Sequence, residues 1–257
     1  MKKFKYVYGP VPSWRLGSSL GIDPLSQKIK VCTFNCIYCQ LGKKVLYTDE
    51  RKVYVETEKV IEEIKRVPEI EIDYITFSGM GEPTLAKNLL EIVRVIRKIR
   101  NEKIAILTNS SLINSDDVKK ELSEFDLVVA KLDAVDQETF LKINRPMDGV
   151  EIRKIIEGVI SFKKNYKGKL ALQIMFTEEN KNHAKEIAKV AAKIHPDEVQ
   201  INTPLRPSKA KPLDKEELSE ISKYFDGLNY MTVYETERKK VVPISEKETM
   251  ERRGKIL

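Results

Sequence analysis

The sequence predicts an α/β fold: a partial (β/α)6 barrel of the TIM type with parallel strands, flanked by short N-terminal and C-terminal additions. Two observations lead to this prediction. Apolar runs typical of buried strands alternate with amphipathic helical patterns over most of the chain, and this alternation indicates parallel strands joined by right-handed crossovers. Polar residues also follow the predicted strands, at the edge where parallel α/β folds bind ligands.

The expected elements follow one another along the chain. A short strand with two prolines, residues 6–12, comes first. Six strands of the barrel are expected at residues 28–31, 73–78, 103–108, 126–133, 169–176 and 198–202. Helices are expected at residues 57–67, 86–100, 115–125, 136–142, 150–166 and 181–194.

The last part of the chain departs from this alternation. Asp214 and Glu217 can form a capping box for a helix that ends near Phe225. A strand-like run at residues 230–234 and a further helix from residue 245 follow. We therefore predict a barrel core at residues 1–210 and a helix–strand–helix extension, packed on that core, at residues 211–257.

The composition fits a globular protein in water. Of the 257 residues, 41% are hydrophobic and 33% are charged, and no apolar run approaches the roughly 20 residues that cross a bilayer. We expect no membrane partner and a cytoplasmic location, which unpaired cysteines also favour. The net charge of +7 is compatible with RNA, but basic and acidic residues are interleaved and no RNA-binding motif accompanies them.

The most informative stretch contains all three cysteines, Cys32, Cys36 and Cys39, with the spacing C-x3-C-x2-C. Three thiolates on one loop can bind three irons of a [4Fe–4S] cluster and leave the fourth iron open to another molecule. A structural zinc site would need a fourth ligand, and only the distant His183 and His195 remain. Inert packing cysteines would not cluster in this way, and a disulfide would leave one thiol over.

This loop, with Tyr38 directly before the last cysteine, resembles the signature loop of the radical S-adenosylmethionine (radical SAM) superfamily. The resemblance implies a [4Fe–4S] cluster whose open iron binds S-adenosylmethionine. It also implies that an electron, supplied by a donor such as a flavodoxin or ferredoxin, cleaves this cofactor to a 5′-deoxyadenosyl radical. Beyond the cluster ligands, no catalytic residue is assigned.

Further residues at the strand ends resemble the superfamily's contacts with S-adenosylmethionine. The stretch from Gly79 to Glu82 is similar to its Gly-Gly-Glu motif, with Met80 inserted, and implies a contact with the amino group. Lys131 is expected at the carboxylate and Asp133 at the ribose, while the Tyr38 backbone would contact adenine. The expected cofactor-binding set is Tyr38, Gly79, Gly81, Glu82, Asn109, Ser110, Lys131, Asp133, Gln173 and Asn202.

A strand-end polar residue can instead cap the next helix. This alternative is serious for Ser110, Ser111 and Asn202, whereas Pro83 argues against it for Glu82. Ser110 also stands where glycine is common in the superfamily. Trp14 and Arg15, upstream of the cysteines, could serve the substrate or the cluster, or could form a packed lid with a surface cation.

Three stretches, residues 8–17, 39–42 and 202–207, look like a group of archaeal and bacterial radical SAM proteins related to the tRNA wyosine-base synthases. Those synthases bind a second cluster through additional cysteines, which this chain lacks. The predicted function is therefore a radical SAM enzyme that abstracts hydrogen from a substrate left open: tRNA, a small molecule or a partner protein that it activates. An iron–sulfur electron carrier that does not use S-adenosylmethionine is the alternative from another class.

Overall fold

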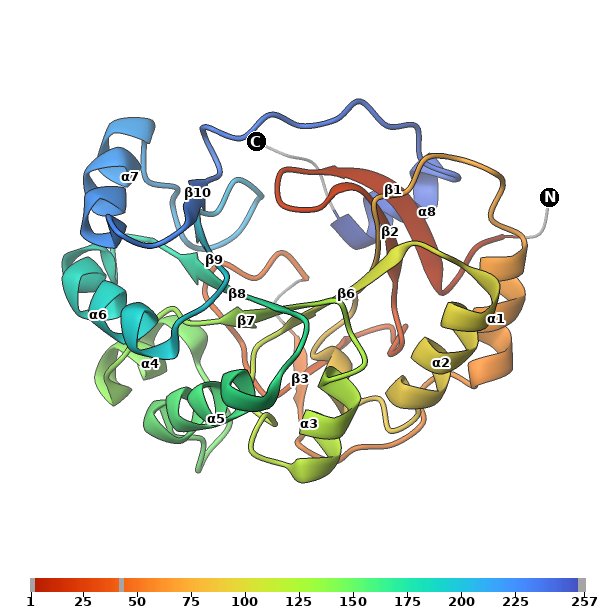
Figure 1. The fold of residues 1–257 in the computed structure, drawn as a ribbon, viewed down its shortest axis with the longest axis horizontal. Helices are drawn as coiled ribbons and strands as arrows, with labels where there is room; N and C mark the ends of the chain where they lie inside the picture. Colours follow the sequence, from red (N-terminus) through yellow and green to blue (C-terminus); the bar gives the residue numbers. More distant parts are fainter. Residues whose placement is uncertain (1–2, 42–43, 254–257) are drawn as a thin grey trace.

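The computed structural model describes residues 3–41 and 44–253. Its main sheet has eight strands in the order β1-β2-β5-β6-β7-β8-β9-β10, and this sheet curls so that the helices cover its outer face (Figure 1). Parallel pairing runs from β2 to β10, and β1 is antiparallel at one edge. The strands are β1 (Val7–Ser13), β2 (Gly17–Ile22), β5 (Tyr74–Phe77), β6 (Lys103–Thr108), β7 (Leu127–Lys131), β8 (Lys169–Met175), β9 (Glu198–Asn202) and β10 (Tyr230–Thr232). The predicted α/β fold, a partial barrel with parallel strands, is confirmed.

Helices follow most of the parallel strands, as the sequence pattern predicts. They are α1 (Thr57–Lys65), α2 (Leu89–Ile99), α3 (Asp116–Leu122), α4 (Gln137–Asn144), α5 (Ile152–Asn165), α6 (Ala184–Ile194), α7 (Lys215–Ser222) and α8 (Glu246–Arg253). Three short 3-10 turns complete them: η1 (Pro83–Leu85), η2 (Lys181–His183) and η3 (Lys223–Phe225). None of the helices in the described part of the chain is long and apolar enough to span a bilayer.

The first strand of the barrel is not the one that the sequence pattern predicts. Residues 30–32 form β3 (Lys30–Cys32), which pairs with β4 (Val45–Tyr47) in a separate two-stranded sheet. The first parallel strand of the main sheet is β2, whose glycines and serines do not resemble a buried strand. At Gly21 a Cβ atom would lie 2.2 Å from the Tyr8 ring, so the missing side chain makes room for an aromatic ring of β1.

The two faces of the sheet are packed differently because successive side chains of a strand point to opposite sides. On the helix side, α2 buries the apolar face that its sequence predicts: Leu89, Ile92, Val93 and Ile96 are fully buried. Burying four such side chains contributes about 6–12 kcal/mol to folding. A separate, smaller cluster contains Ala105 and Ala171 together with Leu16, Leu127 and Val129.

The segment after β10 joins the two edges of the sheet. Residues 235–245, here called the strap, run from β10 back to β1 across the open side of the barrel (Figure 1). Lys239 Nζ lies 2.8 Å from Glu71 and 2.7 Å from Asp73, and the backbone N of Ile244 donates to the carbonyl of Gly9 at 2.6 Å. The region expected as a C-terminal extension thus contains α7, β10, the strap and α8; the outermost residues of the two predicted regions, 1–2 and 254–257, lie outside the described residues.

Candidate active site

The cysteine loop is fixed to the main sheet through the residue before its first cysteine. The backbone N of Val31 donates to the carbonyl of Met80 at 2.9 Å, and the N of Glu82 donates to the carbonyl of Val31 at 3.0 Å. Gly81 lies between these two bonds with φ of +147°, and a Cβ there would be 1.6 Å from the Val31 oxygen. Only glycine permits this approach, so Gly81 fixes the position of Cys32.

Glu82 is a buried carboxylate that joins the ends of two strands. Oε1 accepts bonds from the backbone and hydroxyl of Thr84 and from the Thr108 hydroxyl, and Oε2 accepts from the backbone of Asn109 at 2.7 Å. Burial raises the pKa of this carboxyl above its usual value, although the four donors oppose the shift. The expectation that Pro83 argues against capping is wrong: Glu82 caps η1, and proline is favoured at the first position after a cap.

Two asparagine side chains point amide hydrogens at the cysteines. Asn109 Nδ2 donates to Cys32 Sγ at 3.5 Å and to Thr33 at 2.8 Å. Asn144 Nδ2, at the end of α4, donates to Cys36 Sγ at 3.5 Å. Hydrogen bonds to sulfur are among the features that tune iron–sulfur clusters. Asn144 was not among the predicted site residues, because in sequence it only separates two helices.

The donor set suits a cluster held by thiolates. The three cysteines are unpaired, and the backbone N of Cys39 donates to the carbonyl of Cys36 at 3.0 Å, which keeps the loop tight. Burial raises the pKa of the Cys32 and Cys36 thiols, while Lys30 lowers that of Cys32, so the thiolates need a positive partner such as iron. Within the described ranges, no three His, Cys, Asp or Glu side chains converge closely enough to hold a single metal ion.

Asp133 connects the cysteine loop to β7 and β8. Its carboxylate accepts bonds from the Tyr38 hydroxyl, from Asn144 Nδ2 at 2.7 Å and from the backbone N of Met175 at 2.8 Å. Lys131 Nζ is 3.0 Å from the same carboxylate and 4.9 Å from the centre of the Tyr38 ring. Burial and the neighbouring Asp133 raise the pKa of Tyr38 well above its usual value. The contacts of Lys131 and Asp133 with S-adenosylmethionine stay predictions.

The three residues for which helix capping was the alternative, Ser110, Ser111 and Asn202, do not cap a helix in the described part of the chain. Ser115 precedes α3 and Asp214 precedes α7, whereas the Asn202 side chain accepts a bond from the next backbone N. Ser110 has φ of +65°, a left-handed conformation that glycine adopts most easily. This explains why glycine fits the position, and within the described chain the buried Ser110 hydroxyl has no hydrogen-bond partner.

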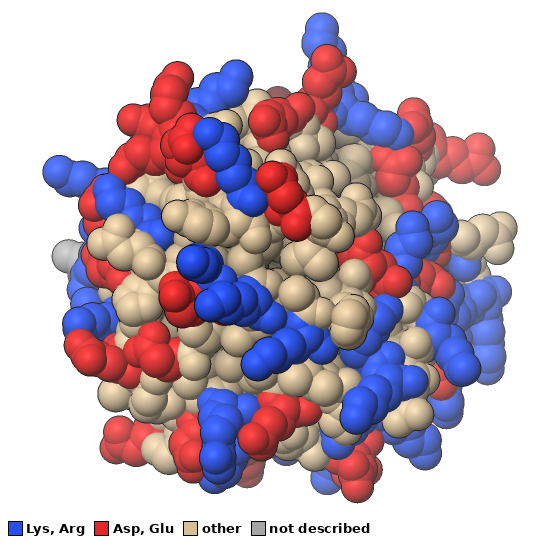
Figure 2. Space-filling view, turned by 60° about the vertical axis from the view of Figure 1, so that its left-hand side comes forward, with Lys and Arg blue, Asp and Glu red and all other residues tan. Residues whose placement is uncertain are grey.

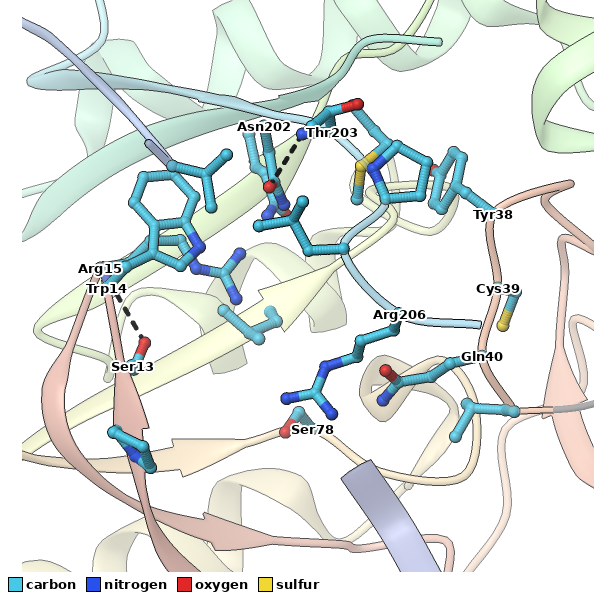
Figure 3. Close-up of a pocket in the computed structure, with 18 of the residues that line it drawn as sticks. Ser13, Trp14, Arg15, Tyr38, Cys39, Gln40, Ser78, Asn202, Thr203 and Arg206 are labelled. Atoms are coloured by element: carbon cyan, nitrogen blue, oxygen red, sulfur yellow. Dashed lines mark hydrogen bonds between the residues drawn. The ribbon is translucent and has the colours of Figure 1, made fainter. Parts of the chain in front are cut away.

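A cavity of about 280 Å³ lies at the carboxyl ends of the strands. Five predicted site residues line it: Tyr38, Cys39, Gly79, Gln173 and Asn202. The others lie in the bonded network that supports the cysteine loop rather than in the lining: Cys32, Cys36, Gly81, Glu82, Asn109, Ser110, Lys131 and Asp133. Figure 3 shows that Tyr38, Cys39 and Gln40 form one wall, facing Trp14 and Arg15 on the other side.

Trp14 and Arg15 therefore belong to the cavity, and the ring of Trp14 is buried. Two further arginines in the lining, Arg206 and Arg238, were not predicted as site residues. Arg206 lies in the loop directly after β9, at a strand end where the general rule for parallel sheets would have found it. Arg238 comes from the strap, which carried no signal in the sequence.

Comparison with known proteins identifies the family. The model of the radical SAM superfamily matches residues 27–191. A UPF0026 protein of Synechocystis sp. is 41% identical over 214 residues, which are 83% of this chain and 79% of that protein. A UPF0026 protein of Methanocaldococcus jannaschii is 39% identical over 84% of this chain and 68% of its own length. A Brachyspira hyodysenteriae protein named GTPase Obg is 38% identical over 88% of this chain, which spans only 34% of that protein.

Solved structures share the fold at low identity. TYW1 with a lysine–pyruvate adduct bound has a TM-score of 0.62 at 18% identity, covering 82% of this chain and 74% of that one. A radical SAM methyltransferase from Sphaerobacter thermophilus has a TM-score of 0.65 at 15% identity, covering 83% and 65%. The anSMEcpe structure with bound AdoMet has a TM-score of 0.61 at 22% identity, covering 84% and 61%.

These findings confirm the resemblance drawn from the cysteine loop. Radical SAM enzymes use a [4Fe–4S] cluster and S-adenosylmethionine, so the predicted cofactors and the predicted class of enzyme are confirmed with the family. The region matched by the family model contains the cysteine loop and every predicted cofactor contact except Asn202. The chain belongs to the radical SAM superfamily and, within it, to the UPF0026 proteins.

Proposed function

We propose that this protein cleaves S-adenosylmethionine reductively and uses the resulting 5′-deoxyadenosyl radical to abstract hydrogen from a substrate bound in the cavity. One observation supports this most strongly: the cysteine loop forms a wall of the cavity, through Tyr38, Cys39 and Gln40. A cluster held by Cys32, Cys36 and Cys39 would then adjoin the space in which a ligand binds.

The residues around this space divide into two roles in the proposal. Tyr38, Gly79, Gln173 and Asn202 line the cavity, so we assign them direct contact with S-adenosylmethionine. Glu82 has both oxygens engaged by neighbouring donors, so we assign it, together with the equally buried Asp133, to holding the strand ends in place.

The reductive step needs an electron, for which we propose a flavodoxin or ferredoxin as the donor. Such donors work in the reducing interior of a cell, where three free cysteines persist. We therefore propose that the protein works in the cytoplasm. Cys36 and Cys39 are only partly buried, so a donor that docks over the cysteine loop comes close to their sulfur atoms.

Anaerobic reconstitution tests the proposal. The protein is loaded with iron and sulfide, mixed with S-adenosylmethionine and dithionite, and assayed for 5′-deoxyadenosine. We expect the product from the wild-type protein and none from Cys36→Ala, which should also lose iron because two ligands remain. Absence of 5′-deoxyadenosine from a wild-type protein with a full cluster, or a full cluster in Cys36→Ala, would contradict the proposal.

A tRNA substrate is a second candidate, favoured by the surface charge. Lys and Arg side chains form a band across the middle of the face on which α4, α6 and α7 come forward (Figure 2). Binding of tRNA through phosphate contacts weakens steeply as salt rises. Affinity for tRNA that stays the same between low and moderate salt would remove this candidate.

An electron carrier without S-adenosylmethionine would not need a cavity lined by strand-end residues. It predicts that the EPR spectrum of the reduced cluster is the same with and without S-adenosylmethionine. Our proposal requires the spectrum to change, because the cofactor binds at the open iron in this superfamily.

A further inference from the structure

The cysteine loop has an outer side that faces away from the cavity. In Figure 3 the other labelled lining residues all lie to one side of the chain that carries Tyr38, Cys39 and Gln40. In the proposed function, S-adenosylmethionine and the substrate occupy that side. The electron that reduces the cluster then arrives from the other side, where the loop meets β4 and the end of α4.

Tyr47 of β4 lies against this outer side of the loop. It pairs with Cys32 in the two-stranded sheet, so the two side chains point to the same face of that sheet. The Tyr47 hydroxyl donates to the carbonyl of Arg145 at 3.0 Å. The backbone N of Asn35, directly before Cys36, donates to the same carbonyl at 3.0 Å. Because Tyr47 is also 42% exposed, it connects solvent with the backbone around two of the three cysteines.

Exposed apolar side chains flank Tyr47. Leu46 precedes it on β4 and is 47% exposed, and Leu141, one turn before Arg145 on α4, is 52% exposed. Exposed apolar side chains that gather on one surface mark interaction sites. Leucine offers a nucleic acid neither a charge nor a ring on which a base can stack. The two leucines therefore favour a protein as the partner.

Three cations border the same surface. Lys44 directly precedes β4, and Arg145 directly follows α4. The backbone N of Lys209 donates to the carbonyl of Ile37, in the cysteine loop, at 3.2 Å. All three charged side chains are exposed, and within the described residues none of them forms an ion pair. We call these cations and the apolar side chains between them the outer surface: Lys44, Leu46, Tyr47, Leu141, Arg145 and Lys209.

We propose that the outer surface docks an electron-transfer protein whose redox group is ringed by acidic side chains, with Tyr47 beneath that group. The inference rests on the proposed function in requiring a cluster that another protein reduces. One electron passes from the reduced donor to the oxidised cluster, and no bond forms or breaks. Complexes of electron-transfer proteins bury little area, so a small apolar centre suffices, while opposite charges around it steer the two proteins together.

Two measurements on the reconstituted protein test the proposal, with a flavodoxin as the probe. Calorimetric titration with the oxidised flavodoxin gives the dissociation constant of the complex. Anaerobic stopped-flow mixing with the reduced flavodoxin gives the rate of cluster reduction, and dithionite, a small reductant that needs no docking surface, provides the reference rate. We expect binding to weaken and reduction by flavodoxin to slow as salt rises, because salt screens the attraction between the two proteins.

Charge reversal on the outer surface should affect the reaction with flavodoxin alone. Arg145→Glu and Lys209→Glu should each weaken binding and slow reduction by flavodoxin about tenfold, and leave reduction by dithionite within about twofold of wild type. Lys98→Glu is the matched control. Lys98 is exposed in the last turn of α2, just before β6 begins, and so lies at the end of the barrel opposite to the cysteine loop. Its reversal should leave binding and both rates unchanged.

The proposal is overturned if Arg145→Glu and Lys209→Glu bind and react with flavodoxin as wild type does, or if Lys98→Glu shows an equal loss. It is also overturned if flavodoxin does not reduce the wild-type cluster. A tRNA transcript that blocks flavodoxin, and that itself loses affinity in the two variants, would assign the surface to RNA instead. If Arg145→Glu fails to fold, Lys44→Glu replaces it and must show the same loss.

These measurements do not depend on the formation of 5′-deoxyadenosine. A protein that flavodoxin reduces in this charge-dependent manner, but that does not cleave S-adenosylmethionine, refutes the proposed function alone. A protein that cleaves S-adenosylmethionine with dithionite, but whose outer-surface variants react with flavodoxin as wild type does, refutes this inference alone.

Discussion

Substitution of Gly81 by alanine should detach the cysteine loop from the main sheet. The added Cβ would lie 1.6 Å from the carbonyl oxygen of Val31, so the backbones must separate and both bonds of Val31, to Met80 and from Glu82, are lost. Two hydrogen bonds at about 1 kcal/mol each and strain of about 1–3 kcal/mol for the left-handed φ sum to about 3–5 kcal/mol. At about 2–4 °C per kcal/mol, the melting temperature should fall by about 6–20 °C.

Two measurements check this expectation. Thermal unfolding followed by circular dichroism gives the change in stability, and iron and acid-labile sulfide per chain after reconstitution give the occupancy of the cluster. We expect both to fall in Gly81→Ala. The control is Gly149→Ala: Gly149 also has a positive φ, of +81°, but nothing lies within 4 Å of its added Cβ. It should lose only about 1 kcal/mol and keep a full cluster.

The reasoning about Gly81 is refuted if Gly81→Ala binds as much iron as wild type and melts within a few degrees of Gly149→Ala. Such a result would mean that the hydrogen bonds of Val31 with Met80 and Glu82 do not determine the position of Cys32.

Three further predictions concern charged side chains, two of them buried (Lys30 and Glu63) and one partly exposed (Asp73). Lys30 is 2% exposed and donates to Asn35 at 3.0 Å. Because Lys30→Met removes a nearby positive charge, it should make the reduction potential of the cluster more negative in an EPR-monitored titration. An unchanged potential would show that Lys30 does not act on the cluster. Glu63 accepts hydrogen bonds from the backbone N–H groups of residues 5–7, so Glu63→Ala should lower the free energy of unfolding in urea by about 2–4 kcal/mol. Glu62→Ala, at an exposed neighbour, should leave it unchanged. Equal losses in the two variants would contradict the role of Glu63 in holding the N-terminal backbone. The hydrogen bond from Lys239 lowers the pKa of Asp73, so the stability that this pair adds is present above the unfolded-state pKa of about 3.9 and is lost as pH falls through the lower folded-state pKa. Asp73→Asn should therefore lose less stability than wild type between pH 5 and pH 2. Parallel plots of unfolding free energy against pH for the two proteins would contradict the role of the strap contact.

The sequence predicts the fold well where hydrophobic periodicity is strong. The strand at residues 103–108 coincides with β6, where an apolar run precedes a helical pattern, and the strand at residues 198–202 coincides with β9, where Val199 and Ile201 alternate with polar residues. It fails at β2, since Gly21 was selected by contact with the Tyr8 ring and not by strand propensity. A contact between two strands of an edge hairpin cannot be read from either strand alone.

The sequence predicts those parts of the candidate site whose residues lie close together in the chain with a characteristic spacing. The cysteine loop is recognisable because its three cysteines lie within residues 32–39. Glu82 was singled out correctly as a strand-end carboxylate, but its bonds to Thr84 and Thr108 depend on how η1 and β6 meet. The convergence of Arg206 and Arg238 depends on the closure of the barrel, which brings together segments separated by β10.

The strap has a consequence for how copies of this protein behave toward one another. An edge strand with free N–H and C=O groups can pair with the edge of another molecule and start aggregation. In β1, the backbone N of Gly9 donates to the Thr249 hydroxyl at 3.0 Å and its carbonyl accepts from Ile244, while an irregular register between Tyr8 and Val11 interrupts the strand. The strap, which also adds an arginine to the cavity, and α8 therefore keep this margin of the sheet from recruiting a second molecule. A chain cut before Lys239 lacks both contacts and should self-associate through β1.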